Sequence, residues 1–589
     1  MVGTVAAVSV ILGLNAYHAD SAAAIVRDGE LIAAAEEERF RRIKHWAGFP
    51  ALAIQYCLDE AGVSLSQVDH IAVNQKNSAN LGRRLAYIAA HPPAPSVLAA
   101  RVRNRRARGN VVTDLEAAFP GIEVPAQLHR VEHHLAHIAS AYLASPFDEA
   151  AVASIDGFGD FTSGAWGAAR GSSISISTRV HYPHSLGVFY QALTQWLGFP
   201  HYGDEYKVMG LAPYGEPKQT EKIRQLVELH ADGRYSLNQE YFTLQAGVEY
   251  TWNGGQPVFG PLYSAQLEDL LGPARSQDDS LEQRHKDIAR SVQEVFEDAY
   301  FNVLNSLYRE QPSTNLCLAG GCAMNSVANG KVYERTPFTS MYLPAAAGDA
   351  GGAVGTALLV SEEIGELAQR PIMGAYLGPG FGRSELSDVI EQTNARLSES
   401  SAVVTEYLDD DELVDVVAKA LANGAVVGWF QGRMEWGPRA LGARSILADP
   451  RRIEMKDVLN LKVKRRESFR PFAPSILRES VSEWFETDDD VPFMMQVFTV
   501  QEDKRQELQA TTHVDGSGRL HTVQREENPI YWKLIERFGS MTGVPVVLNT
   551  SFNENEPVVC KPEEALETFL RTNIDMLVLG PFVITRASG

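Results

Sequence analysis

Two similar runs of strand-forming residues constrain the fold of this chain more than any other feature. Residues 8–36 contain three apolar segments, VSVILGL, AAAIVRDG and ELIAAAEEE, and the pair Asp28-Gly29 is typical of a hairpin turn. Residues 150–185 repeat the pattern with AAVASID, a glycine-containing turn, SGAWGAARG and SISISTRV. Because helical segments lie between these runs, the repeat predicts a duplicated α/β domain with a cleft between its halves.

The length of 589 residues is more than one hydrophobic core can support, so several domains are expected. Composition changes at residues 361–382, which end in a cluster of glycine and proline, and we place a domain boundary near 365–385. The two predicted domains are residues 1–370 and 371–589. Strands and amphipathic helices alternate after the boundary, which makes the second domain α/β as well.

Composition excludes several classes of protein. The net charge of −21 argues against nucleic acid as the main partner, because binding a phosphate backbone requires a cationic surface. No stretch of about 18 uninterrupted apolar residues occurs, so no membrane span is expected, and the apolar start, residues 1–14, lacks the basic region of a signal peptide. Four widely spaced cysteines without a C-x-x-C pair are typical of the reducing cytoplasm.

Histidines and aspartates indicate a metal site in the first domain. His133 and His137 are four residues apart in a helical segment, so both imidazoles lie on one face, whereas His134 points elsewhere. Asp156 and Asp349 lie in glycine-rich turns next to apolar segments, where carboxylates project from the ends of strands. Two histidines and two carboxylates suit Fe(II), Mn(II) or Zn(II) better than Mg(II) or Ca(II).

A second constellation is basic and lies in the second domain. Five cations occur within 38 residues, separated by glycine, proline and aromatic residues: Arg433, Arg439, Arg444, Lys464 and Arg470. Cations that converge from different elements can bind a phosphate or a carboxyl phosphate through bidentate contacts. The alternative for this set is a solvated basic surface. The run Arg101–Arg108, which holds five further arginines, is given no role.

Three turns are further candidates for ligand binding. Gly320-Gly321 joins a strand to a helix, an arrangement that can present backbone N–H groups to a phosphate. The segment NTSFN ends a strand with Asn549 and Ser551, at the edge where open α/β sheets bind ligands. In GDEYKVMGLAPYG, Glu205 and Lys207 form an acid–base pair before a turn.

Nine motifs spread in order along nearly the whole chain resemble one family. They are GLNAYHADSAA, HHLAHIASAY, SIDGFGD, GDEYKVMGLAPYG, LAGGCAMN, GDAGGAVG, GRMEWGPRALGARSILADPR, FRPFAPSIL and NTSFN. The chain is similar to the ATP-dependent O-carbamoyltransferases, which include enzymes of nodulation-factor and antibiotic biosynthesis. The resemblance says least about residues 75–125 and 220–280.

The resemblance implies a duplicated actin-like ATPase (ASKHA) domain followed by a YrdC-like α/β domain. It also implies the reaction, in which carbamoyl phosphate and ATP give carbamoyl adenylate, and the carbamoyl group then passes to a hydroxyl of a small-molecule acceptor. By the family pattern, His133, His137, Asp156 and Asp349 hold a divalent metal, with Fe2+ expected, and Mg2+ accompanies ATP. The carbamoyl-phosphate and adenylation pocket would be formed by Arg439, Lys464, Arg470, Arg519 and Ser551.

Roles follow for individual residues. His18, in the polar turn after the first strand, is the candidate general base for the acceptor hydroxyl. The predicted catalytic set is His18, Arg439, Lys464 and Arg470. The predicted substrate- or nucleotide-binding set adds Lys207, Arg519, Asn549, Ser551, Gly320, Gly321 and Asp160, the last as either a turn or a nucleotide-phosphate residue.

Two other functions remain open from the sequence. One is a tRNA threonylcarbamoyl-type modification enzyme, which the net charge disfavours, and the other is a nucleotide-binding regulator without turnover. The acceptor, the identity of the metal and the role of residues 220–280 cannot be derived from the residues. The oligomeric state is open too, with a homodimer as one option.

Overall fold

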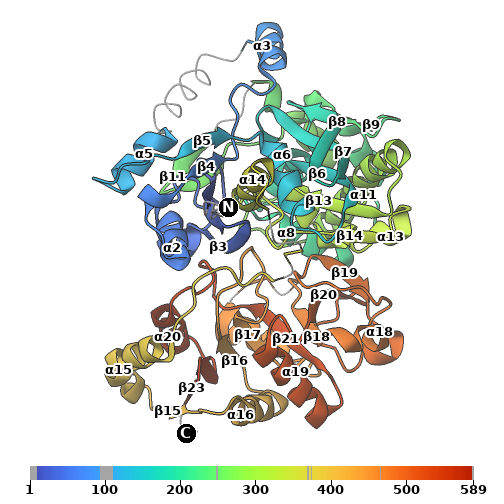
Figure 1. Cartoon of the computed structure of the whole chain (residues 1–589). Helices are drawn as coiled ribbons and strands as arrows, with labels where there is room; N and C mark the ends of the chain where they lie inside the picture. Colours follow the sequence, from blue (N-terminus) through green and yellow to red (C-terminus); the bar gives the residue numbers. More distant parts are fainter. Residues whose placement is uncertain are drawn as a thin grey trace. The chain divides into compact units, whose positions relative to one another are not determined.

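The computed structural model describes residues 9–92, 110–246, 250–367, 371–372, 374–464, 466–467 and 469–586. The chain forms two compact units, Met1–Ile372 and Met373–Gly589, and the division falls inside the region 365–385 that composition indicated (Figure 1). The arginine run Arg101–Arg108 lies outside the described residues.

The first sheet of unit 1 is built on the first predicted meander. Its strands are β1 (Val10–Asn15), β2 (Ala22–Arg27), β3 (Glu30–Glu36), β4 (His70–Val73) and β5 (Gln127–Arg130), in the order β3-β2-β1-β4-β5. β1, β2 and β3 are antiparallel neighbours, whereas β4 pairs parallel with both β1 and β5. Asp28 and Gly29 turn between β2 and β3 with φ values of 53° and 77°, as expected for a tight hairpin turn.

The second sheet of unit 1 repeats this topology. Its strands are β6 (Glu149–Gly159), β7 (Thr162–Arg170), β8 (Ser173–His181), β13 (Asn315–Ala319) and β14 (Ser340–Tyr342), in the order β14-β13-β6-β7-β8. Three antiparallel strands are again followed by two parallel ones, so each sheet has its first strand in the centre. The predicted α/β class and the duplication are confirmed.

Two helices pack closely at the centre of unit 1. They are α6 (His133–Tyr142) and α14 (Gly351–Glu363), and α14 is buried from Gly351 to Ser361 (Figure 1). Glycine permits the close packing: a Cβ on Gly355 would lie 1.9 Å from the carbonyl oxygen of Ala136, and one on Gly13 of β1 would lie 2.0 Å from that of Ala353. The N-termini of both helices therefore have fixed positions relative to the sheets.

Other helices and hairpins complete unit 1. The predicted long helix is α11 (Gln283–Glu310), whose apolar positions are buried. The described residues between 220 and 280, to which no structure was assigned from sequence, form short elements rather than a separate domain. The remaining elements are α1 (Glu38–Arg41), α2 (Ala51–Ala61), α3 (Leu81–Ala90), α5 (Val111–Ala118), α7 (Leu186–Trp196), α8 (Glu205–Leu211), α9 (Thr220–Arg224), α10 (Ala265–Leu271), α12 (Ser326–Asn329), α13 (Val332–Arg335), β9 (Val227–Leu229), β10 (Tyr235–Leu237), β11 (Tyr250–Asn253) and β12 (Gln256–Phe259).

Unit 2 is built on one mixed sheet in the order β15-β23-β22-β16-β17-β21-β18-β20-β19. Its strands are β15 (Ala402–Glu406), β16 (Val427–Phe430), β17 (Arg444–Ala448), β18 (Ala473–Leu477), β19 (Gln496–Thr499), β20 (Ser517–Val523), β21 (Val546–Ser551), β22 (Met576–Leu579) and β23 (Phe582–Arg586). Its helices are α15 (Arg383–Glu399), α16 (Asp410–Ala422), α17 (Met455–Leu459), α18 (Val481–Trp484), α19 (Pro529–Thr542) and α20 (Pro562–Arg571). Two apolar clusters form its core. Across the described parts of both units, each helix is too short or too polar to cross a membrane.

Candidate functional site

Helix α6 brings two imidazoles together at its N-terminal end. Glu132 caps the helix by accepting a hydrogen bond from the backbone N–H of Leu135 at 2.9 Å. His133 and His137 then lie on the same face, with their Nε2 atoms 3.1 Å apart. His134 points elsewhere and contacts the hydroxyl of Ser154 through Nδ1 at 2.9 Å, as the helical spacing predicted.

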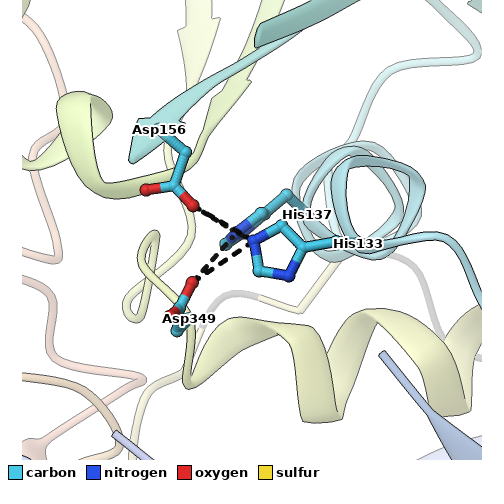
Figure 2. Close-up of side chains that lie close together, drawn as sticks. All are labelled: His133, His137, Asp156 and Asp349. Atoms are coloured by element: carbon cyan, nitrogen blue, oxygen red, sulfur yellow. Dashed lines mark hydrogen bonds and ion pairs between the residues drawn. The ribbon is translucent and has the colours of Figure 1, made fainter. Parts of the chain in front are cut away.

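Two aspartates from distant parts of the chain face these imidazoles (Figure 2). Asp156, near the end of β6, places Oδ2 at 3.1 Å from Nε2 of His133 and 3.3 Å from that of His137. Asp349, in the turn before α14, places Oδ1 at 3.4 and 3.5 Å from the same two atoms. One atom from each side chain lies within 4.8 Å of all the others. The structure thus brings together all four residues that were predicted as metal ligands.

The backbone around the cluster leaves room for it and fixes its orientation. A Cβ on Gly159 would lie 2.0 Å from Cγ of His133, so only glycine fits beside the ring. The backbone N–H of Gly321 donates to Oδ1 of Asp156 at 2.8 Å. Oδ2 of Asp160 accepts the backbone N–H groups of His133 at 3.1 Å and Lys76 at 2.8 Å.

These contacts correct one expectation and decide between two others. The N–H group of Gly321, in the turn with Gly320, is used by a carboxylate, so this turn positions Asp156 and does not present that amide to a phosphate. Asp160 turns the chain with a φ of 48° and ties β6 to the start of α6, so it acts as a turn residue. Of the two roles considered for Asp160, the structure favours the turn over phosphate contact.

Charge in the four-residue cluster is concentrated and shielded from water. Burial alone would lower the pKa of the His133 and His137 imidazoles, but hydrogen bonds to Asp156 and Asp349 outweigh it and raise the pKa of both. Burial opposes ionisation of Asp349 as well, yet the two histidines lower the pKa of its carboxyl to about 2. Two imidazole nitrogens and two carboxylate oxygens that converge in this way form a donor set suited to one divalent cation.

Two further predicted residues lie in unit 1. The His18 ring is centred 5.3 Å from the His133 ring, which puts the candidate base beside the cluster. Lys207 pairs with Asp204 at 2.8 Å, three residues before it on the same turn of chain. Burial, with Asp204 adding to it, raises the pKa of the Glu205 carboxyl to about 7.

Sequence reasoning missed a second group of close donors, Asp20, Glu38 and His45, which could also hold a metal ion. Nδ1 of His45 lies 2.7 Å from Oδ1 of Asp20, and its backbone N–H donates to Glu38 at 2.7 Å. Burial opposes the His45 charge, but Asp20 and Glu38 raise the pKa of this imidazole to about 9. Arg39 pairs with Glu38, so the group is an ion-paired network, and the charged run EEERFRRIKH was its only sequence signal.

In unit 2 the structure gathers the basic residues around the end of β21. The Lys464 side chain is buried, and Nζ contacts the carbonyl oxygen of Ser551 at 2.6 Å and its hydroxyl at 3.2 Å. Nζ also contacts the carbonyl and side-chain oxygens of Asn553, each at 2.8 Å. Asn549, two residues before Ser551, donates through Nδ2 to the carbonyl of Ala440 at 2.9 Å, next to Arg439.

Four arginines are close enough to act on one another electrostatically. Burial, followed by the charges of Arg439, Arg466 and Arg470, lowers the pKa of the Arg519 guanidinium well below its ordinary value. Nε of Arg519 is shielded from water and meets no acceptor within the described chain. Arg466, which was not among the predicted site residues, joins the set. Guanidinium groups held this close repel one another and favour a bound anion.

Two arginines of the predicted constellation donate to backbone carbonyls. The Arg444 guanidinium is fully buried and donates to carbonyls of Gln431, Ala443, Pro379 and Gly432 at 2.8 to 3.1 Å. Arg433 donates to the carbonyls of Leu377 and Gly378. Both therefore hold the backbone of residues 377–379 and 431–443, and their assignment to a phosphate site was wrong.

Comparison with protein families bears on both units. A model described as carbamoyltransferase N-terminus matches residues 10–358, and one described as carbamoyltransferase C-terminus matches residues 418–586. The chain belongs to the carbamoyltransferase family. It is therefore an enzyme rather than a non-catalytic regulator, and the resemblance noted in the sequence is confirmed.

Relatives of this carbamoyltransferase come from several bacteria. An uncharacterized protein of Synechocystis sp., sll1178, is 42% identical over 98% of this chain and 97% of its own. The nodulation protein NolNO of Sinorhizobium fredii is 40% identical over 97% and 80%, respectively. A 3'-hydroxymethylcephem-O-carbamoyltransferase of Amycolatopsis lactamdurans is 33% identical over 46% of this chain and 49% of its own.

Proposed function

We propose that this carbamoyltransferase is ATP-dependent and works in two steps, one in each unit. Unit 2 converts carbamoyl phosphate and ATP to carbamoyl adenylate, and unit 1 transfers the carbamoyl group to a hydroxyl of a small molecule. One observation carries the proposal: each unit gathers a cluster of opposite chemistry, anionic metal donors in unit 1 and convergent cations in unit 2.

The first step requires cations around phosphate groups. In balance, ATP, carbamoyl phosphate and water give carbamoyl adenylate, pyrophosphate and phosphate. Water cleaves carbamoyl phosphate to carbamate and phosphate, and a carbamate oxygen then bonds to the α-phosphorus of ATP as the bond to pyrophosphate breaks, so negative charge accumulates around phosphate groups in both events. Arg439, Arg470 and Arg519 supply guanidinium groups and Lys464 an ammonium group that Ser551 and Asn553 orient. These residues bind carbamoyl phosphate and the ATP phosphates, and Mg2+ accompanies the nucleotide.

The second step requires a nucleophilic oxygen and a stabilised leaving group. His133, His137, Asp156 and Asp349 would hold a divalent cation, and the family resemblance implies iron. When bound, such an ion supplies Lewis-acid stabilisation of charge on the adenylate. His18, beside His133, accepts the proton of the acceptor hydroxyl as its oxygen attacks the carbamoyl carbon and AMP leaves.

The acceptor class follows from relatives. The Amycolatopsis relative is named for carbamoylation of a hydroxymethyl group on a cephem, and the Sinorhizobium relative is named for nodulation. We infer that the acceptor of this enzyme is likewise a hydroxyl of a small molecule, such as a sugar or another natural product, and that the enzyme acts in the cytoplasm.

Pyrophosphate release tests the proposal directly. Purified protein is incubated with ATP, Mg2+ and carbamoyl phosphate, and pyrophosphate and carbamoyl adenylate are measured. We expect pyrophosphate release that depends on carbamoyl phosphate. Its absence in the presence of each of Fe2+, Mn2+ and Zn2+ in turn would contradict ATP-dependent activation.

A further inference from the structure

We propose that Oδ1 of Asn549 and Oε2 of Glu435 bind the amino group of carbamoyl phosphate and so select this substrate over other acyl phosphates. The inference rests on the proposed function, because it concerns the same cation cluster in unit 2. It adds what cations cannot supply, which is recognition of a hydrogen-bond donor.

Glu435 is buried with one of its two oxygens committed to the backbone. Its side chain is 4% exposed, and Oε1 accepts the backbone N–H groups of Leu441 at 2.8 Å, Ala443 at 2.9 Å and Arg444 at 3.0 Å. Oε2 is shielded from water and meets no donor among the residues that the structure describes. A buried carboxylate oxygen without a donor is costly, so this position favours a ligand that brings one.

Asn549 shows the same asymmetry. Its side chain is 1% exposed, and Nδ2 donates to the carbonyl of Ala440 at 2.9 Å and to the hydroxyl of Ser475 at 3.0 Å. These two bonds fix the amide, which leaves Oδ1 shielded from water and without a donor in the described part of the chain. The two acceptors without a donor, Oε2 of Glu435 and Oδ1 of Asn549, therefore belong to side chains that are hydrogen-bonded to one loop, residues 435–444. This loop also carries Arg439.

The sheet register places Asn549 on the same face as the cations. Asn549 of β21 is the partner of Ala473 in β18, and Ser475 of β18 is the partner of His521 in β20. Continuing the second register by two residues puts Arg519 on the other side of Ala473. Asn549 and Arg519 are thus two strands apart, about 10 Å, which suits a small anion bound at both ends. Ser551, two residues further along β21, contacts Lys464.

The chemistry of the substrate matches this division. Guanidinium and ammonium groups are donors only, so they bind the phosphate oxygens of carbamoyl phosphate but cannot distinguish it from acetyl phosphate or inorganic phosphate. The carbamoyl NH2 group is a donor that needs acceptors. A site built to accept such a hydrogen bond rejects the analogue that lacks it, because its own polar atoms are then left unpaired.

Binding measurements on the full chain test the inference. Carbamoyl phosphate and acetyl phosphate are titrated by calorimetry into the wild type, Asn549→Leu and Glu435→Gln. Glutamine keeps an oxygen for the three backbone N–H groups but turns the other atom into a donor. Glu564→Gln is the matched control, because Glu564 also accepts backbone N–H groups, from Cys560 and Lys561.

We expect the wild type and the control to prefer carbamoyl phosphate by about tenfold or more. In both variants the Kd for carbamoyl phosphate should rise by about tenfold, while the Kd for acetyl phosphate stays within about twofold. Retained acetyl phosphate binding also reports that the variant is folded, and Glu435→Gln decides if Asn549→Leu fails to fold.

Three results would overturn the inference. The first is that the wild type binds carbamoyl phosphate no more tightly than acetyl phosphate, and the second is that a variant weakens the binding of both ligands equally. The third is an unchanged preference for carbamoyl phosphate in Glu435→Gln, which buried water at the two acceptors would give. Each is distinguishable from failure of the proposed function. If the proposed function itself were wrong, the wild type would release no pyrophosphate from ATP with carbamoyl phosphate.

Discussion

The side chains of His133 and His137 lie close together in unit 1, with their Nε2 atoms 3.1 Å apart, and both face two carboxylates. A cation at this point would be lost with any one of its ligands. We predict that wild-type protein binds about one divalent metal per chain. His137→Ala should weaken binding by more than the ~10–100-fold that loss of an outer-shell partner costs, because His137 would be a direct ligand. Elemental analysis after dialysis measures this.

The adjacent His134 provides the control for the metal prediction. It is equally buried in α6 but contacts Ser154, so His134→Ala should keep its metal. Loss of metal from this variant as well would show that the packing of α6, rather than ligation by His137, sets the affinity.

Arg519 illustrates the cost of a cation cluster. Because burial and three neighbouring arginines lower the pKa of its guanidinium, the charged side chain destabilises the empty site. We predict that Arg519→Met raises the thermal midpoint without ligand by a few degrees. The same variant should lose the stabilisation that carbamoyl phosphate gives the wild type, as measured by calorimetric scans with and without this ligand.

Arg537→Met is the matched control for Arg519. Arg537 pairs with Asp415 at the surface of unit 2, so its removal should leave the stabilisation by carbamoyl phosphate intact. If Arg519→Met were stabilised by carbamoyl phosphate as much as the wild type, this arginine would not belong to the anion site.

At the scale of elements, the β6–β7 hairpin links sheet and metal donors. It carries Asp156 on β6, and Gly159 leaves space for the His133 ring. A Cβ at Gly159 would overlap that ring at 2.0 Å, whereas a Cβ at Gly157 would have no atom within 4 Å. We predict that Gly159→Ala loses bound metal and carbamoyl transfer but that Gly157→Ala keeps both, as metal analysis and product assays would show.

The two substitutions add the same methyl group to the same hairpin, so a general effect on strand stability should appear in both. Equal loss of metal from Gly157→Ala and Gly159→Ala would contradict the steric argument. It would point instead to backbone flexibility of the hairpin as the property that glycine supplies.

Local patterns predicted much of the fold and part of the sites. The two meanders follow from short apolar segments and a turn pair, and the His133–His137 pair follows from helical spacing, because these signals depend on near neighbours. Arg444 and Arg433 could not be assigned in this way. Their partners are carbonyls of segments 377–379 and 431–443, whose approach is set by the sheet of unit 2.

The same limit applies to the residues that were missed. Glu435 became a candidate because its Oε2 lacks a donor in the described chain, which only packing reveals. Asn549 was expected from the strand end NTSFN, but only packing singles out its Oδ1. The network of Asp20, Glu38 and His45 depends on the turn after β1 meeting the segment after β3. In contrast, Asp349 was found from its glycine-rich turn although it lies far from Asp156 in sequence.

At the scale of the whole molecule, the proposed reaction is divided between two units that each have their own core and their own cluster of functional residues. Activation needs the cations of unit 2, and transfer needs the metal donors of unit 1. The two half-reactions should therefore fail separately when one cluster is damaged. A single-site enzyme would lose both together.

The most direct test measures pyrophosphate release and carbamoyl transfer in parallel for the wild type, Lys464→Ala, Lys462→Ala and His137→Ala, with ATP, carbamoyl phosphate and an accepted hydroxyl compound. Lys462, which pairs with Asp575, is the control for Lys464. We predict that Lys464→Ala loses both products by ~100-fold or more, as for a group that stabilises charge in the transition state. His137→Ala should release pyrophosphate almost normally but transfer no carbamoyl group. Equal loss of pyrophosphate release in Lys464→Ala and His137→Ala would contradict the division of labour.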